Sequence, residues 1–243
     1  MFGKTTEWIS GLGHDFTQTF VDANRWLALL KGLGVTLRLT AFALLLGVVV
    51  GVVVAVIRST HDQLAVQRRS KPILNFADGL CKAYLTVIRG TPVMVQLLIM
   101  YFVIMVSSTN KLLVATLTFG INSGAYVAEI VRSGIMSIDK GQTEASRSLG
   151  LGYIDTMRYV IIPQAVKNIL PALGNEFITL LKETSIVNVV GMVDITKWAM
   201  QVQGRTYQAF MPFIGIACVY LIMVFIFSRL VAMLERRLNT DDR

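Results

Sequence analysis

The stretch LTAFALLLGVVVGVVVAVI, residues 39–57, runs for 19 residues without a charged side chain. A helix rises about 1.5 Å per residue, so about 20 apolar residues cross the ~30 Å hydrocarbon core of a bilayer. A run of this length is therefore expected to span a membrane. The composition agrees, because 54% of the 243 residues are hydrophobic and the mean hydropathy is +0.61, well above that of a globular protein.

Three further uncharged runs have the length of a span: residues 90–110, 112–128 and 206–228. A fifth segment, residues 168–192, is apolar in outline but contains Glu176, Lys182 and Glu183. Charges in hydrocarbon are costly unless they are buried or paired, so this segment is either a span with a polar face or a re-entrant or surface segment. Taken as a span, it predicts an all-α, polytopic membrane protein with about five transmembrane helices.

Lysine and arginine are distributed unevenly between the two sides of this topology. The segments 58–89 and 132–167, together with the tail from Arg229, hold 15 of them, whereas the other side holds 7. The positive-inside rule assigns the richer side to the cytoplasm, so the N-terminus is expected outside and the C-terminus inside. This bias accounts for the net charge of +8 and calls for no nucleic-acid partner.

Residues 1–32 are expected to form an outer lead. Spaced apolar residues between Phe16 and Leu33 suit a helix lying in the membrane interface, and a loosely ordered lead is the alternative. The lead lacks the apolar core and cleavage site of a signal peptide. The tetrad GKTT at residues 3–6 resembles the end of a phosphate loop, but the earlier glycine and the preceding strand are missing.

The chain shows no catalytic or metal-ligating constellation. Its two histidines, His14 and His61, are expected on opposite sides of the membrane, and its two cysteines form no framework. The sequence therefore predicts no cofactor in this chain and no enzyme activity of its own.

The segment EASRSLGLGYIDTMRYVIIP, residues 144–163, is charged and lies between two apolar runs. Asp139 followed three positions later by Gln142 is typical of a capping box, which predicts a helix beginning there. Gly150 permits the left-handed conformation that ends a helix, and Gly152 can open the next one, running towards Pro163. The sequence predicts an inner helix-turn-helix.

Two roles are open for this segment. Ala145 and Ser146 are small, so another protein can approach the first helix closely, while Glu144 supplies a charge at its rim. A docking element is therefore one interpretation. A solvated amphipathic connector between spans is the other.

Several residues here carry a resemblance to a known family. The pattern resembles the EAA loop of ABC importer permeases, usually written EAA, three residues, G, nine residues, I-x-LP; the matching residues are Glu144, Ala145, Gly150 and Pro163, with Val160 and Ile162 in the apolar positions before the proline. Ser146 stands at the place of the second alanine. The departures are conservative: serine replaces the second alanine, and valine and isoleucine replace the isoleucine and leucine before the proline.

Three more stretches narrow the resemblance to permeases for polar amino acids of the histidine, glutamine and arginine type. LLKGLGVTLRLT (residues 29–40) is similar to that family's entry segment, and RGTP (residues 89–92) looks like the signature before its second span. ALGNEFITLLKETS (residues 172–185) resembles its fourth span, which normally has aspartate where this chain has Glu183. Residues 1–28 and the tail lie outside the resemblance.

The resemblance implies a function and a set of partners. Such permeases form pores from two copies or from a pair of paralogues in a bacterial-type inner membrane. Each seats its EAA loop, here residues 137–167, on a cytoplasmic ABC ATPase dimer that binds ATP and Mg, and an extracytoplasmic binding protein delivers the amino acid. The chain would then be one permease domain over 1–243, with its membrane core at 33–232 and a cytoplasmic tail at 233–243.

The polar residues of the fifth segment are candidates for the substrate path. A transported amino acid offers a carboxylate and an ammonium, so its site needs both donors and acceptors. Internal pairing of Lys182 with Glu176 or Glu183 is the alternative. Asn122 and Glu129 are weaker candidates, the latter because it can simply snorkel or pair with Arg132. The path candidates are Asn175, Glu176, Thr179, Lys182, Glu183, Thr184, Ser185 and, from another segment, Gln96.

Two glycine pairs predict packing rather than chemistry. Gly47 and Gly51, like Gly120 and Gly124, are four residues apart, the spacing that lets membrane helices approach closely.

Two functions of other classes remain as alternatives. The first is a stand-alone secondary transporter, driven by an ion gradient, with Glu176 and Glu183 as proton or sodium sites. The second is a membrane scaffold whose inner loop recruits a cytoplasmic partner.

Overall fold

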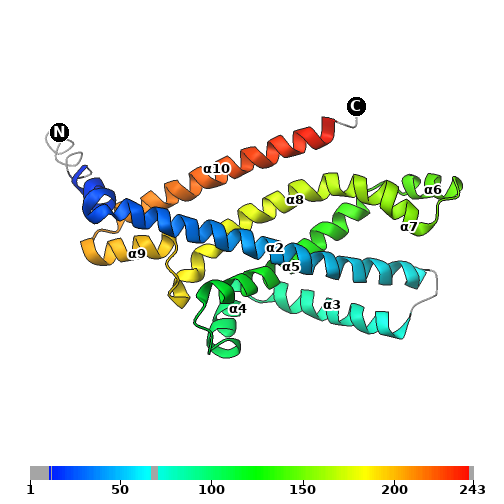
Figure 1. The fold of residues 1–243 in the computed structure, drawn as a ribbon, viewed down its shortest axis with the longest axis horizontal. Coiled ribbons are helices and arrows are strands. Elements are labelled where there is room, and N and C mark those ends of the chain that lie inside the picture. Colours follow the sequence, from blue (N-terminus) through cyan, green and yellow to red (C-terminus); the bar gives the residue numbers. More distant parts are fainter. Residues whose placement is uncertain (1–10, 12, 67–70, 241–243) are drawn as a thin grey trace.

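The computed structural model describes residues 11, 13–66 and 71–240, all of whose regular structure is helical (Figure 1). The predicted all-α class is therefore confirmed. Residues 1–10 and 12 of the lead, which include the GKTT tetrad, and residues 241–243 of the tail lie outside the described residues. The α-helices are α2 (Arg25–Val66), α3 (Pro72–Gly90), α4 (Val93–Ile99), α5 (Lys111–Met136), α6 (Lys140–Ser148), α7 (Tyr153–Thr156), α8 (Ile162–Glu183), α9 (Ile195–Thr206) and α10 (Phe210–Thr240).

Three helical segments of the described chain are long and apolar enough to cross a membrane: Gly13–Asp62, Lys111–Met136 and Phe210–Leu238. They contain the predicted spans 39–57 and 112–128 and most of 206–228, although α10 begins only at Phe210. A bent pair of helices, α3 with the segment from α4 onward, counts as a fourth if it forms one span. Helix α8 is 22 residues long but too polar to be among them. The count of five spans thus stays a prediction.

The prediction of a continuous span over residues 90–110 is wrong. The chain bends by 106° between α3 and the helical segment Val93–Ile104. Thr91 is extended (φ −122°, ψ 143°), as expected for a residue that precedes a proline, and Pro92 has no N–H with which to continue the helix. The RGTP motif therefore breaks the second membrane segment within its apolar stretch.

Helices α2 and α5 pack closely along their lengths, as both glycine pairs predict. A Cβ atom on Gly51 would lie 2.6 Å from the Val127 side chain, and one on Gly120 would lie 2.6 Å from Leu46. Both distances are far below van der Waals contact, so only glycine allows the two backbones to come this near.

Residues 16–33 do not form one regular helix, and their predicted place in the membrane interface stays a prediction. A π-helical turn (Thr17–Val21) and a 3₁₀ turn (Asp22–Asn24) come first, with left-handed backbone at Ala23 and Asn24, and α2 begins at Arg25. The Phe20 ring stacks on Trp198 of α9 with centroids 5.6 Å apart. This lead is therefore packed against α9.

Helix α8 differs from the predicted span 168–192 at both ends. Helical backbone runs without a stop from α7 through a π-helical turn (Met157–Ile161) into α8, so the loop's second helix does not end at Pro163. The wide π turn lies where the proline ring would clash with a carbonyl of the preceding turn. At the other end, α8 gives way to a 3₁₀ helix (Thr184–Val190), which turns at Gly191 (φ +72°).

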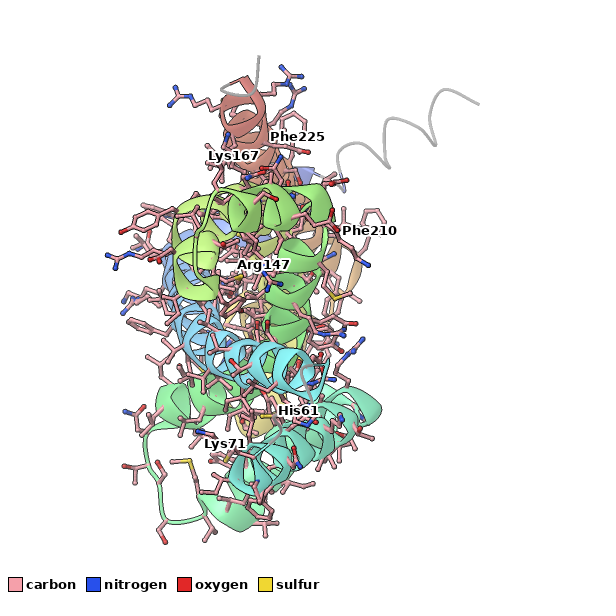
Figure 2. All side chains as sticks on the ribbon, turned by 90° about the vertical axis from the view of Figure 1, so that its right-hand side faces the viewer. His61, Lys71, Arg147, Lys167, Phe210 and Phe225 are labelled. Atoms are coloured by element: carbon pink, nitrogen blue, oxygen red, sulfur yellow. The ribbon has the colours of Figure 1, made fainter. Side chains whose placement is uncertain are left out.

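The long helices define two ends of the molecule. Figure 1 shows α6 and α7 at one end and the N-terminus with α9 at the other. Figure 2 looks along the molecule from the α6 end, where Arg147 and His61 both lie. Because α7 continues into α8, the segment 140–161 is connected directly to the helix that carries most of the candidate path residues.

Candidate functional site

Asp139 caps the start of α6, as predicted. The Asp139 Oδ1 atom accepts a hydrogen bond from the Gly141 amide at 2.7 Å. The reciprocal half of a capping box is missing, because the Gln142 Oε1 atom accepts instead from Gln164 Nε2 of α8 at 3.3 Å. The glutamine therefore ties α6 to α8, and the aspartate alone caps the helix.

The helix ends at Gly150, also as predicted. Its φ of +84° lies in the left-handed region. The Gly150 amide donates to the Arg147 carbonyl at 3.0 Å, and the Leu151 amide donates to the Ser146 carbonyl at 3.1 Å. These two bonds make a Schellman motif, which satisfies the last carbonyls of α6 and reverses the chain sharply.

The candidate coupling residues divide into an outer and an inner set. Glu144, Ala145, Gly150 and Pro163 are exposed. Ser146 is buried, and its hydroxyl donates to the Gln142 carbonyl within α6 at 2.6 Å. A small residue is therefore needed at this position by packing inside the chain.

Sequence reasoning missed two apolar side chains beside this helix. Leu149 is 83% exposed and Ile154 is 75% exposed, on either side of the Gly150 turn. Large apolar side chains so exposed are typical of surfaces that another protein covers. Their position at the tip of the helix-turn-helix is a signal that the sequence already contained.

A second polar contact joins this end of the molecule to α8. The Asn168 Nδ2 atom donates to Ser137 Oγ at 2.8 Å, just before α6 begins. The Gln142–Gln164 bond thus holds α6 to α8, and the Asn168–Ser137 bond holds the end of α5 to the same helix. A displacement of α6 is thus passed to α8 through packed contacts as well as through the chain.

Further along α8, Glu176 is held between α8 and α5. Its Oε1 atom accepts a hydrogen bond from Ser123 Oγ at 2.7 Å. Ser123 is fully buried beside Gly47 of α2, so the contact lies inside the helix bundle. Sequence reasoning assigned Ser123 no role beyond its place in a glycine spacing, because its partner lies 53 positions away.

Three candidate residues of α8 share an uncovered face. Asn175, Thr179 and Lys182 are exposed, in keeping with their helical spacing. Helix α2 packs against α8, and just past its end the hydroxyls of Thr40 and the buried Thr184 are 3.5 Å apart. The exposed polar residues therefore lie on the side that α2 leaves open.

The remaining path candidates lie around the end of α8. Glu183 and Ser185 are half-buried, and the Ser185 carbonyl accepts a hydrogen bond from Asn188 Nδ2 at 2.7 Å. The ion pairs found in the described part of the chain include none between Lys182 and either Glu176 or Glu183.

Gln96 lies at the break between α3 and α4. Its Nε2 atom donates to the carbonyls of Ile88 (2.8 Å) and Thr91 (3.1 Å), and its Oε1 atom accepts from Asn122 Nδ2 of α5 at 3.0 Å. The side chain thus satisfies carbonyls freed by the break and fastens it to α5. Nearby, the Tyr84 hydroxyl donates to the Ile121 carbonyl at 2.5 Å, another contact that sequence reasoning missed.

Glu129 does not pair with Arg132. Its Oε2 atom lies 2.5 Å from Nη1 of Arg89 at the end of α3, while Arg132 pairs with Asp62 at 3.6 Å. The broken helix explains the difference, because it ends α3 beside α5 with Arg89 in its last turn. Among the described residues, no group of three or more His, Cys, Asp and Glu side chains is placed to hold a metal ion.

The comparisons with known proteins agree with this architecture. The family model described as "Binding-protein-dependent transport system inner membrane component" matches residues 73–240. A putative glutamine transport system permease protein GlnP of Rickettsia bellii is 36% identical, and the match covers 87% of this chain and 93% of that protein. The arginine transport system permease protein ArtQ of Bacillus subtilis is also 36% identical, with 88% and 94% covered.

Solved structures show the same fold. A chain of a structure described as "Crystal structure of an amino acid ABC transporter with histidines" superposes with a TM-score of 0.80 at 42% identity, over 90% of this chain and 98% of that one. A chain of the MetNI methionine ABC transporter in an inward-facing conformation gives 0.71 at 22% identity, over 90% and 99%, and shares the fold.

These matches cover the broken helix, the helix-turn-helix and α8 together. The protein is a multi-pass inner-membrane protein and a transport component rather than an enzyme. The chain belongs to the family of binding-protein-dependent transport system inner membrane components, the permeases of ABC transporters.

Proposed function

We propose that this chain forms half of the pore of an ATP-driven importer of polar amino acids. The observation that carries the proposal is the continuous helix from α7 into α8, which joins the exposed helix α6 to the polar face of the membrane core. The names of the relatives, which refer to glutamine and arginine, support a polar amino acid as the substrate.

The partners follow from this assignment. A cytoplasmic ATPase dimer receives α6 of each subunit and binds the ATP and Mg, so this chain carries no nucleotide site. A second copy or a paralogue completes the pore, and an extracytoplasmic binding protein delivers the substrate. The N-terminus then lies outside and the C-terminus inside, with 1–32 as the outer lead, 33–232 as the core and 233–243 as the tail.

Coupling proceeds from the loop to the core. Closure of the ATPase dimer moves α6. The contact surface is formed by Glu144 and Ala145 of α6, with the apolar side chains of Leu149 at its end and Ile154 of α7. The Gln142–Gln164 contact and the continuous backbone pass this movement along α8 to Glu176. The subunits then rock between inward-open and outward-open arrangements.

The substrate path runs along the side of the core that α2 leaves uncovered. Asn175, Thr179 and Lys182 are exposed there, and exposed polar side chains within a membrane face water or another subunit. Glu176, Glu183, Thr184 and Ser185 lie behind this face. Gln96 belongs to the support of the path, because its amide is engaged at the break.

Uptake by whole cells separates this function from an ion-driven transporter. Cells with and without the gene take up labelled glutamine, arginine or histidine, first with arsenate to deplete ATP and then with ionophores to collapse ion gradients. The proposal predicts that the gene-dependent uptake stops with arsenate and survives the ionophores. The reverse pattern would establish a secondary transporter, and the absence of gene-dependent uptake would favour a scaffold.

A further inference from the structure

Helix α3 carries two exposed faces of opposite character. Asp78 and Cys81 are buried against α2, and α3 is exposed on both sides of them. The exposed residues on one side are charged, and those on the other side are apolar. Lys82 and Arg89, two turns apart, share a charged face. A charged face within a membrane needs water or a partner, whereas an apolar one suits lipid. The apolar face consists of Ile73, Phe76, Leu80 and Val87.

Helix α5 extends the charged face. Tyr126, Glu129 and Ser133 are exposed and follow one another at spacings of three and four residues, so they form one stripe. The Arg89 guanidinium joins this stripe to α3: it pairs with Glu129 at 2.5 Å and lies 5.6 Å from the centroid of the Tyr126 ring. The two helices thus present one continuous polar surface.

This surface is hollowed beside Arg89. A depression of about 430 Å³ is a suitable size for a small ligand. A smaller hollow of about 40 Å³ shares Arg58, Leu85 and Arg89 with it and reaches Glu129. Three cations line the larger depression, whose lining consists of Arg58, Lys82, Leu85, Thr86, Arg89 and Gly90.

The charges around the depression leave a positive excess. The Asp78 carboxylate is already met by Lys82 at 2.7 Å and faces Arg58 at 3.6 Å. Glu129 is the acid that faces Arg89. An arriving carboxylate therefore meets a positive potential, and an arriving ammonium finds an acceptor at Glu129.

We propose that Arg89 and Glu129 bind the α-carboxylate and the α-ammonium group of the transported amino acid. This inference rests on the proposed function and adds a binding site on α3 and α5 to the path candidates of α8. A guanidinium receives a carboxylate through two parallel hydrogen bonds. The two side chains now satisfy each other, and a zwitterion between them replaces one ion pair by two, so neither charge is left unpaired.

The break in the second membrane segment positions this site. Arg89 is in the last turn of α3, and Gln96 holds that turn by donating to the carbonyls of Ile88 and Thr91. Gln96 is thus a positioning residue. Recognition of the α-carboxylate and α-ammonium groups is common to all α-amino acids, so selection among side chains falls to other groups of the path or to the binding protein.

Direct binding to the purified permease, with its co-purifying subunits and without a binding protein, tests the assignment. The probes are labelled L-glutamine, L-arginine and L-histidine, displaced by the parent amino acid, its methyl ester or its Nα-acetyl derivative. The wild type should bind each blocked derivative about tenfold or more weakly than the parent, the range of one lost charge-assisted contact.

Each variant should lose its preference for the parent amino acid over one of the two blocked derivatives. Arg89→Gln should weaken parent binding about tenfold and bind ester and parent within about threefold of each other, while still rejecting the acetyl derivative. Glu129→Gln should bind the acetyl derivative and the parent about equally, while still rejecting the ester. Arg89→Lys keeps the charge and should retain most of the binding. The matched control is Arg38→Gln, because the Arg38 guanidinium donates to the Gly34 carbonyl of its own helix. This variant should bind the parent amino acid and both derivatives as the wild type does.

Two results would overturn this binding site and leave the proposed function standing. The first is that Arg89→Gln and Glu129→Gln still distinguish the parent from both derivatives as the wild type does. The second is that the charge-swapped pair, Arg89→Glu with Glu129→Arg, recovers wild-type binding. The latter would make the pair purely structural. If the wild type bound none of the three amino acids, the inference and the proposed function would fail together. Size-exclusion profiles identify any variant that has lost its assembly.

Discussion

At the residue scale, the buried contact between Ser123 and Glu176 shows how polar groups are accommodated in this core. The carboxylate accepts a 2.7 Å hydrogen bond from a fully buried hydroxyl. A buried acceptor that loses its donor costs about 1–3 kcal/mol, whereas removal of both partners is nearly neutral. The contact therefore contributes to stability whether or not Glu176 also meets substrate.

Ser123→Ala should lower the free energy of unfolding by about 1–3 kcal/mol, because Glu176 is left without its donor. Adding Glu176→Leu should restore much of this loss. Thermal unfolding of the purified complex measures both changes. Equal stability of Ser123→Ala and the wild type would show that the hydrogen bond contributes nothing.

Glu183→Gln should change substrate-stimulated activity without preventing assembly. The residue is half-buried at the end of α8, so loss of its charge alters the path while the amide keeps the shape of the side chain. ATP hydrolysis by the purified complex, with and without amino acid, checks this. Unchanged kinetics would assign Glu183 to structure alone.

At the scale of elements, turns and close packing were more predictable than contacts between helices. Asp139 and Gly150 bound α6 as local sequence rules require. The break at Thr91 was also predictable, because the residue before a proline avoids helical backbone. The pairs Arg89–Glu129 and Ser123–Glu176 were not, since each depends on how helices distant in sequence rotate against each other.

Gly150→Ala should loosen the end of α6 and weaken docking. The φ of +84° costs an alanine about 1–2 kcal/mol, although a Cβ there would meet open space. Recovery of the co-purified ATPase subunit measures docking. Gly152→Ala is the matched control, because that glycine has an ordinary φ of −67°. Equal losses in both variants would contradict a conformational cause.

Gly51→Ala should separate α2 from α5. Its Cβ would lie 2.6 Å from Val127, so a backbone shift costing about 1–3 kcal/mol is expected. Gly79→Ala on α3, where a Cβ meets nothing within 4 Å, should leave the melting temperature close to that of the wild type. If both variants melted alike, the close packing of α2 and α5 would not limit stability.

At the scale of the whole molecule, polar side chains with different proposed roles lie in different parts of the chain. Helix α6, which carries the exposed Glu144, lies at one end of the molecule and α9 lies at the other (Figure 1). The exposed polar residues of α8 come between these two helices in the chain. Composition and hydropathy predicted the membrane class. They did not predict that the charged side chains of α3, α5 and α8 stay uncovered in one subunit, because this depends on how the helices pack. A second subunit across this face would complete the path.

The coupling role of α6 is tested most directly by purifying the tagged protein from its native membrane in mild detergent. The wild type and Glu144→Arg are purified in parallel, and the proteins that accompany each are identified. The wild type should bring an ATPase subunit, and Glu144→Arg should lose it while the permease dimer persists, because the reversed charge lies on the exposed docking helix. Glu235→Arg, the same reversal on the exposed surface of α10, should retain the subunit. Absence of any ATPase from the wild type under conditions that preserve the dimer, or equal recovery with Glu144→Arg, would contradict the coupling role of α6.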